Sequence, residues 1–259
     1  MFDIKKGRIN EIRDLVYREF GIHISDNKIG SIEPKINKLL MNEKYRTAED
    51  FFSELETGNP KTKELLIKYI TTNHTYFFRE AEHFTHLLED IKKTNKTNIT
   101  IWCAASSTGE EPYSIAMTLL DEGIKDFKIL ASDLDRCVLE EFNEGIYNEN
   151  RFIKTSKYQK IKYFEKLSEG VYKIRSELRK HICIKRLNLM DNLYFTQPFD
   201  YIFCRNVFIY FDDTSRQRTL ETLARSLVSG GKLYIGHTET LFTFPSSLRR
   251  EANSVYRKF

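Results

Sequence analysis

The chain has 259 residues, of which 41% are hydrophobic and 30% are charged, and its formal net charge is +4. This length permits one large domain, or a large domain beside a small one, and the apolar content is enough to bury a core without disulfides. The charge is mild and no run is strongly basic, so a nucleic-acid partner is not expected.

Cysteine usage and hydropathy indicate the compartment. The four cysteines form no C-x-x-C pair, which argues against a metal or redox motif and favours a reduced cytosol. Residues 1–6 are too polar for a signal peptide. No apolar stretch approaches ~20 residues, so direct insertion into a membrane is not expected. The sequence therefore predicts a cytoplasmic protein.

The first seventy or so residues carry helical patterns. In the first pattern Ile9, Ile12, Val16 and Phe20 recur at helical spacing, and Gly21 ends the run. Three more patterns lie at residues 29–40, at residues 51–55 after a cap at Thr47 and Asp50, and at residues 65–70. We therefore place an N-terminal helical domain at residues 1–75 and a second domain at residues 76–259.

Basic residues cluster around the second predicted helix. They are Lys28, Lys35, Lys38, Lys44 and Arg46. A solvated helix face and a surface for an acidic partner both explain such a cluster, and the pattern leaves the two open.

Beyond a Thr- and Asn-rich segment at residues 94–98, short apolar runs alternate with helical patterns. Strands are predicted at residues 99–104, 127–132, 199–204, 232–236 and 254–259. Helices are predicted at residues 112–120, 137–142 and 214–227. Such alternation implies an α/β fold with parallel strands joined by right-handed crossovers. It is interrupted at about residues 147–190, where segments 171–175 and 181–185 predict a small antiparallel β insertion.

The segment from residue 99 to residue 113 predicts a cofactor-binding turn. A strand ends, small residues follow from Ala104 to Gly109, and a helix opens with Pro112 in its first turn. Small side chains let a ligand approach the backbone closely. Glu110 and Glu111 would repel a pyrophosphate, and they suit a cationic ligand without phosphate. S-adenosylmethionine, with its ammonium and sulfonium groups, meets that requirement.

Two later strands end in polar residues that support this interpretation. Asp133 ends the strand at 127–132, and a carboxylate there can accept hydrogen bonds from a ribose diol. Its structural alternative is a turn or helix cap. Arg205 and Asn206 follow the strand at 199–204, with Tyr210 just beyond. Ligands of parallel sheets bind beyond the carboxyl ends of strands, so these residues are expected to converge on one crevice.

Four long motifs resemble those of the CheR-type family, the chemotaxis receptor protein-glutamate O-methyltransferases, and the resemblance covers nearly the whole chain. They are TTNHTYFFRE at 71–80, STGEEPYSIAM at 107–117, CRNVFIYFD at 204–212 and GHTE at 236–239. The resemblance implies a Rossmann-like class I methyltransferase sheet with an N-terminal all-helical domain and a small antiparallel β insertion. It implies S-adenosylmethionine as cofactor, S-adenosylhomocysteine as product and no metal.

The resemblance also implies roles for individual residues. Arg79 and Tyr210 would lie near the transferred methyl group as catalytic residues. Cofactor contacts would come from Asn73, Thr75, Arg79, Glu110, Asp133, Asn188, Leu189, Arg205 and Asn206. Family members dock the receptor's methylation helices on the N-terminal domain, particularly on its basic second helix. Some also hold a receptor pentapeptide on the β insertion, but the loop at 165–170 is short, so a pentapeptide tether is not expected here.

The chemistry requires little of the protein beyond alignment. A glutamate is already ionised at pH 7, so no general base is needed, and the six histidines form no recognisable catalytic motif. We expect an enzyme, by default a monomer, recruited from the cytoplasm to membrane receptor arrays. A methyltransferase of the same fold acting on another acceptor, and a catalytically inactive cofactor-sensing module, are the alternatives.

Overall fold

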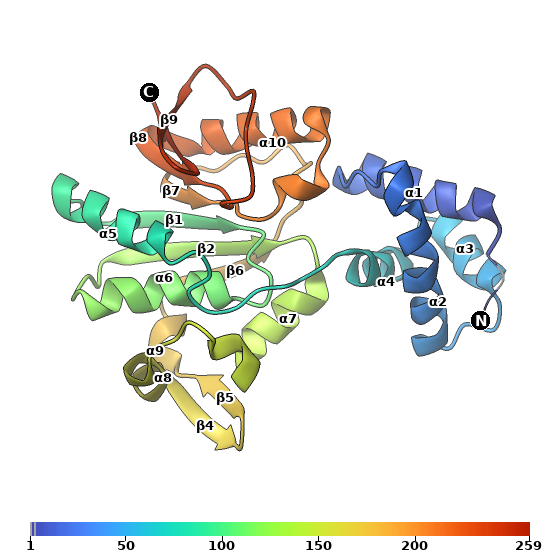
Figure 1. The fold of residues 1–259 in the computed structure, drawn as a ribbon, viewed down its shortest axis with the longest axis horizontal. Coiled ribbons are helices and arrows are strands. Elements are labelled where there is room, and N and C mark those ends of the chain that lie inside the picture. Colours follow the sequence, from blue (N-terminus) through green and yellow to red (C-terminus); the bar gives the residue numbers. More distant parts are fainter. Residues whose placement is uncertain (1, 3) are drawn as a thin grey trace.

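The computed structural model describes residue 2 and residues 4–259, and Figure 1 shows their arrangement in two parts. Helices α1 to α4 form a unit at the N-terminus, and a larger α/β unit follows. Residues 1 and 3, which the predicted N-terminal domain includes, lie outside the described residues. Within the described part of the chain, no helix combines the length and the apolar character needed to cross a bilayer.

The N-terminal unit consists of short helices around their own apolar core. These are α1 (Lys6–Phe20), the 3-10 helix η1 (Asp26–Ser31), α2 (Ile32–Asn42), α3 (Ala48–Glu56) and α4 (Pro60–Ile70). Gly21 ends α1 in a left-handed conformation (φ 68°), and Thr47 and Asp50 cap α3 reciprocally, as predicted. The buried side chains of these helices form one cluster, separate from the cores of the α/β unit.

One of the basic residues around α2 does not belong to a solvated face. The ammonium group of Lys35 donates a hydrogen bond to the carbonyl of Ile70, at 2.6 Å, and burial lowers its pKa. This contact fixes α2 against the end of α4. The remaining basic side chains, Lys28, Lys38, Lys44 and Arg46, are exposed or nearly so.

The larger unit is built on a seven-stranded mixed sheet in the order β6-β2-β1-β7-β8-β10-β9. Its strands are β1 (Ile99–Ala104), β2 (Phe127–Asp133), β6 (Ile182–Arg186), β7 (Phe199–Phe203), β8 (Leu227–Tyr234), β9 (Leu248–Ala252) and β10 (Val255–Lys258). Strands β1, β2, β6, β7 and β8 are parallel to one another, whereas β10 runs antiparallel to both of its neighbours, β8 and β9. The sequence predicted neither β9 nor this reversal, and Leu227, expected to end a helix, begins β8.

Helices cover both faces of the sheet (Figure 1). Helices α5 (Glu82–Thr94), α6 (Glu110–Asp121) and α7 (Arg136–Glu144) bury their apolar sides in one core with alternate residues of the strands. Helix α10 (Asp213–Ser226) buries Leu220 and Leu223 in a second core on the opposite face, beside Trp102. Alternation of side chains along buried strands produces these two cores.

The insertion is a second, three-stranded antiparallel sheet in the order β3-β5-β4. It contains β3 (Ile146–Asn148), the 3-10 helix η2 (Glu149–Phe152), α8 (Lys157–Tyr163), β4 (Phe164–Ser168), β5 (Val171–Ile174) and α9 (Ser176–Arg179). The predicted loop at 165–170 is mostly strand β4, and only Glu169 and Gly170 form the turn.

The assignment of residues 181–185 to the insertion was wrong. These residues form most of β6, which pairs in parallel with β2 at the edge of the main sheet. Strand β6 is short and mostly exposed, so its sequence lacks the apolar run of a central strand. The consequence matters for the site, because residues 187–189 now follow the carboxyl end of a parallel strand.

Candidate active site

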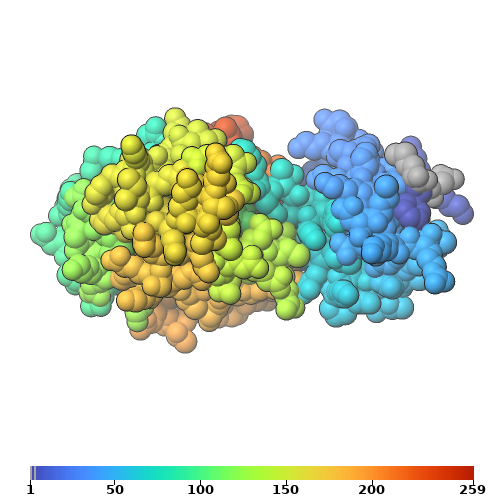
Figure 2. Space-filling model, turned by 90° about the horizontal axis from the view of Figure 1, so that it is seen from below, coloured from blue at the N-terminus to red at the C-terminus, as the bar shows by residue number. Residues whose placement is uncertain are grey.

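A pocket lies where the carboxyl ends of β1, β2, β6 and β7 face the N-terminal unit. The sheet order changes direction between β1 and β7, which is where open α/β sheets bind ligands. Figure 2, turned from Figure 1, shows the two units side by side, with the segment after α4 between them. The pocket is lined from the N-terminal side by Phe20, Ile22 and residues 70–76, and from the sheet by residues 105–107, Glu111, Asp133, residues 187–189, residues 205–207 and Tyr210.

The structure brings together most of the residues predicted to form the site. Asn73, Thr75, Arg79, Asp133, Asn188, Leu189, Arg205, Asn206 and Tyr210 all line this one pocket. They come from four separate stretches of the chain, three of which follow the carboxyl ends of parallel strands. Their contacts with a bound cofactor remain predictions.

Glu110 is the exception among the predicted residues. It is fully buried and lies outside the pocket lining, where Thr108 donates a hydrogen bond to one of its carboxylate oxygens at 2.7 Å. Arg151 lies 3.4 Å from the other oxygen, and burial raises the Glu110 pKa. The neighbouring Glu111 lines the pocket instead. The sequence showed both carboxylates but could not show which side of α6 faces the crevice.

The turn after β1 has the backbone of a ligand-binding loop. Ala105, Ser107 and Gly109 have positive φ angles of 67°, 50° and 93°. A Cβ atom on Gly109 would collide with the ring of Phe142, so only glycine fits there. The hydroxyls of Ser106 and Ser107 are buried without a hydrogen-bond partner among the described residues. These two groups lie in the pocket lining and can bond a ligand.

Asp133 ends β2 and faces the same pocket. One of its carboxylate oxygens accepts a hydrogen bond from the backbone amide of Ser107 at 2.8 Å, and the other accepts one from Asp135 at 3.0 Å. Each oxygen keeps a further lone pair for a ligand hydroxyl. Burial raises the Asp133 pKa to about 6, although the two amides act in the opposite direction. Asp133 is therefore a preorganised acceptor.

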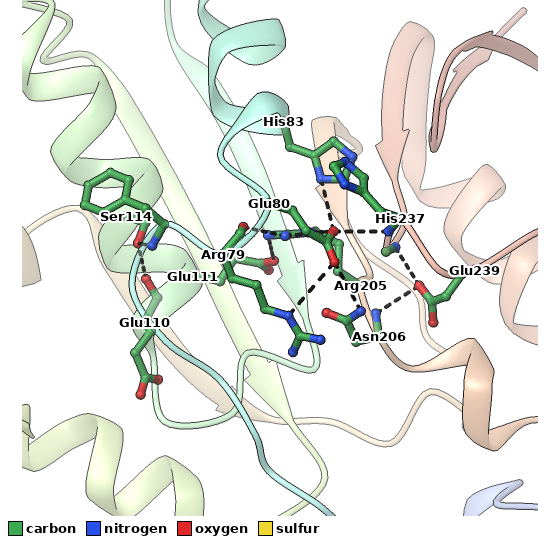
Figure 3. A network of polar contacts seen from close by, with 12 residues as sticks. Arg79, Glu80, His83, Glu110, Glu111, Ser114, Arg205, Asn206, His237 and Glu239 are labelled. Carbon is green, nitrogen blue, oxygen red and sulfur yellow. Dashed lines mark hydrogen bonds and ion pairs between the residues drawn. The ribbon is translucent and has the colours of Figure 1, made fainter. Parts of the chain in front are cut away.

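Arg205 joins the sheet to the segment after α4 through a buried ion-pair network (Figure 3). Its guanidinium lies 3.0 Å from a carboxylate oxygen of Glu80 and 2.8 Å from one of Glu111. It also donates a hydrogen bond to the backbone carbonyl of Arg79 at 2.5 Å. Burial would raise the Glu80 pKa, but Arg205 outweighs it and holds that pKa below its usual range. Burial raises the Glu111 pKa despite the same partner.

Arg79 and Tyr210, the two residues expected near the transferred methyl group, are each held by a hydrogen bond to a backbone group. The guanidinium of Arg79 donates a hydrogen bond to the carbonyl of His74 at 2.8 Å. The carbonyl of Tyr210 accepts one from the amide of His23 at 2.7 Å. The Tyr210 hydroxyl makes no hydrogen bond to any described residue, which leaves it available to a ligand.

Two asparagines line the pocket and already hold protein groups. The side-chain amide of Asn73 donates to Asp135 at 3.1 Å, and that of Asn188 donates to the carbonyl of Glu19 at 2.8 Å. Each contact ties a different part of the chain to the pocket wall. The polar lining thus depends on both structural units.

A group of potential metal ligands lies behind Arg205, and within the described residues it consists of Glu80, His83 and His237, with ligand atoms within 4.8 Å of one another. Both ring nitrogens of His83 are buried without a partner there, and burial lowers its pKa to about 3. The carboxylate of Glu80 is already bonded to Arg205. The absence of a metal from the reaction stays a prediction.

The geometry defines a class of protein: an α/β fold with a nucleoside-type crevice at its topological switch point. The unpartnered serine hydroxyls and the carboxylate of Asp133 fit a ribose-bearing ligand, as S-adenosylmethionine would be.

Comparisons with known proteins give the family. Residues 73–256 match the CheR methyltransferase SAM-binding domain, and residues 8–71 match the CheR methyltransferase all-alpha domain. The chain therefore belongs to the CheR methyltransferase family, and its larger unit is a SAM-binding methyltransferase domain. The match changes from one domain to the other between residues 71 and 73.

Curated relatives support the same assignment over nearly the full length. A chemotaxis protein methyltransferase of Borreliella burgdorferi is 40% identical over 92% of this chain and 90% of its own. One of Escherichia coli is 34% identical over 98% of this chain and 91% of its own. Among solved structures, the glycopeptide N-methyltransferase MtfA with S-adenosyl-L-homocysteine shows 15% identity and a TM-score of 0.38, over 64% of this chain and 51% of that one. That last likeness is too weak to carry an argument.

Proposed function

We propose that this enzyme transfers a methyl group from S-adenosylmethionine to glutamate side chains of bacterial chemotaxis receptors, forming methyl esters that set receptor adaptation. The supporting observation is that Arg79, Asp133, Asn206 and Tyr210 line one pocket in a chain of the CheR family. The acceptor and the ester product are the proposed parts, because the family match extends only to a SAM-binding methyltransferase.

The cofactor, when bound, supplies a methyl group made electrophilic by its sulfonium. A glutamate carboxylate is ionised at neutral pH and needs no proton removed, so the protein's task is to align the reactants and exclude water. In-line alignment of this kind can supply ~7–11 kcal/mol of the barrier. Transfer to a carboxylate oxygen would leave S-adenosylhomocysteine as the product and would require no proton transfer by the protein.

The proposed roles of individual residues follow from where their side chains lie. Asp133 would accept hydrogen bonds from the ribose hydroxyls, and Asn73, Thr75, Asn188, Leu189, Arg205 and Asn206 would complete the cofactor contacts. Arg79 would orient the incoming carboxylate by a charge-assisted contact. Its bond to the His74 carbonyl restrains the guanidinium, which favours orientation over tight clamping of the nucleophile. The free hydroxyl of Tyr210 would position the substrate or the methyl group.

The receptor would approach from the N-terminal side of the pocket. Lys28, Lys38, Lys44 and Arg46 around α2 offer an exposed basic surface to an acidic helix, whereas Lys35 is bound within the domain. The turn between β4 and β5 has two residues, which supports the expectation that no pentapeptide tether is used. We propose a monomer that works in the cytoplasm and is recruited to membrane receptor arrays.

An ester assay tests this function. Purified receptor cytoplasmic domains are incubated with the enzyme and methyl-labelled S-adenosylmethionine, and volatile methanol released by base is counted. Glutamate methyl esters are base-labile, whereas N-methyl groups are not. Label that resists base, or no label on receptor glutamates, would contradict the proposal. Receptors with and without a C-terminal tail are compared in the same assay, and equal rates are expected because no tether is used.

A further inference from the structure

Glu239 is a buried carboxylate that lies behind the pocket and does not line it. It follows β8 by a few residues and is 6% exposed. Figure 3 shows it on the far side of Asn206 from the pocket residue Arg79. Glu239 has no role in the proposed methyl transfer, so its burial needs another explanation. A buried carboxylate is costly unless donors surround it.

Three backbone amides supply those donors, and they come from two loops. One oxygen of Glu239 accepts hydrogen bonds from the amides of Gly236 at 2.6 Å and Asn206 at 2.9 Å. The other oxygen accepts one from Phe208 at 2.7 Å. The loop after β7 and the loop after β8 are therefore held together by one side chain. Converging backbone amides of this kind form an anion-binding nest, here filled by the chain's own carboxylate.

The backbone conformation of the loop after β7 directs its amides toward Glu239. Asn206 has a φ of 59°, a left-handed conformation that asparagine adopts more readily than other non-glycine residues. This conformation lets the amides of Asn206 and Phe208 point to the same carboxylate, while Arg205, Asn206 and Tyr210 face the pocket. Without an anion the two amides would be buried donors lacking a partner, and the loop would gain by relaxing.

Gly236 allows the close approach of the two loops. A Cβ atom at this position would lie 2.5 Å from the side-chain nitrogen of Asn206 and 2.8 Å from a carboxylate oxygen of Glu239. Any side chain here must push Asn206 or Glu239 away. Gly236 and Glu239 therefore act together: the glycine leaves room for the two loops to approach, and the glutamate forms the hydrogen bonds between them.

We infer that Glu239 is a positioning residue for the cofactor pocket: its carboxylate fixes the 205–210 segment so that Arg205, Asn206 and Tyr210 face the ligand. The inference rests on the proposed cofactor role of that pocket and not on the identity of the methyl acceptor. It extends the site to a residue that neither lines the pocket nor contacts the reacting atoms.

The decisive variant is Glu239→Gln, which keeps the size of the side chain but places an NH2 group against backbone donors. Binding of S-adenosylhomocysteine is measured by calorimetry well below the melting temperature, so that the variant is fully folded. We expect affinity at least tenfold weaker, with amide NMR shifts confined to Gly236, Asn206 and the residues around Phe208. Glu221→Gln, an exposed change on α10, is the matched control and should bind as the parent does.

Gly236→Ala disturbs the contact between the two loops while leaving the Glu239 carboxylate in place. It should also weaken S-adenosylhomocysteine binding, and it replaces Glu239→Gln as the test if that variant does not fold. Parental affinity in a folded Glu239→Gln, or in Gly236→Ala, would overturn the inference and reduce Glu239 to a stabilising residue. Because no receptor is present in this measurement, its outcome is independent of the ester assay.

Discussion

The hydroxyl of Tyr17, in α1, donates a hydrogen bond to the carboxylate of Asp212 at 2.7 Å. Asp212 is the N-cap of α10, and its other oxygen accepts a bond from the amide of Ser215. The residues just before it, Tyr210 and Phe211, line the pocket. The first helix of the all-helical unit is thereby attached to the wall of the cofactor pocket. The pocket is complete only when the two units are in contact.

Removing this hydroxyl should weaken cofactor binding without affecting the fold. In Tyr17→Phe the interface loses one hydrogen bond, worth ~0.5–1.5 kcal/mol, and partial exposure of Tyr17 places the effect at the lower end. We expect S-adenosylhomocysteine to bind about two- to fivefold more weakly by calorimetry. Tyr158→Phe, on the exposed side of α8, is the control. Identical affinities for the two variants would show that the interface does not shape the pocket.

Cofactor affinity should depend on pH through Asp133. Its pKa in the free protein is about 6, raised by burial, and ribose hydroxyls would donate to its ionised form. Below pH 6 the carboxyl is protonated before the ligand arrives, so binding must expel a proton and weakens as the pH falls. Above pH 7 the group is ionised and affinity levels off. Calorimetry from pH 5 to pH 8 should show this rise.

Asp133→Asn is the matched variant for the titration. The amide keeps the shape of the side chain but cannot titrate, and its NH2 group replaces one acceptor. We expect weaker binding at pH 8 and a nearly flat pH profile between pH 5 and pH 7. If the variant kept the parental pH dependence, another group would have to titrate, and Glu111, a lining residue whose pKa is raised by burial, is a candidate.

Much of the sheet could be predicted because buried strands have continuous apolar runs. Strands β1, β2 and β7 are central and buried, and their ends carried the site residues Asp133, Arg205 and Asn206. Strand β6 is an edge strand with exposed side chains, so nothing in its composition separates it from an insertion. The predicted cofactor residues Asn188 and Leu189 came from the family resemblance, and only the structure explains their place.

The parts of the site that could not be predicted depend on which face of a helix a side chain occupies and on buried contacts between distant segments. Glu110 and Glu111 are adjacent, and one step along a helix turns a side chain by about 100°, so the crevice-facing one could not be chosen without packing. Glu80 and Glu239 lie inside the motifs at 71–80 and 236–239. In the structure Glu80 binds the guanidinium of Arg205, and Glu239 binds backbone amides such as that of Asn206. Such contacts arise between distant segments and leave no periodic signal.

Arg79 gives a prediction about turnover. Arg79→Ala should lower kcat by about tenfold to a hundredfold, because the incoming carboxylate loses its orienting charge. Its anchor, the His74 carbonyl, lies on the exposed side of the pocket, so the fold should be retained. Arg79→Lys keeps the charge without the planar fork and should recover part of the rate. Near-parental methylation of receptor by Arg79→Ala would reject the assignment.

Arg205 should contribute to the stability of the fold as well as to the lining of the pocket. Its side chain is 3% exposed, and Arg205→Leu would leave Glu80 and Glu111 buried without their common partner. Breaking a buried ion pair from one side typically costs about 3–5 kcal/mol. Trp102 is the only tryptophan and is buried, so its fluorescence reports urea unfolding. Arg218→Leu, an exposed change on α10, is the control and should cost little.

The loss in Arg205→Leu should be greatest at neutral pH and smaller at acid pH. Arg205 holds the Glu80 pKa below its usual value, so in the parent this carboxylate contributes stability above the unfolded pKa and loses it as the pH falls. Without Arg205, burial raises the pKa of both glutamates, and protonation then relieves the unpaired charge. The difference in unfolding free energy between parent and variant should therefore narrow from pH 7.5 to pH 5. A difference that stayed constant with pH would mean that lost packing, and not unpaired charge, destabilises the variant.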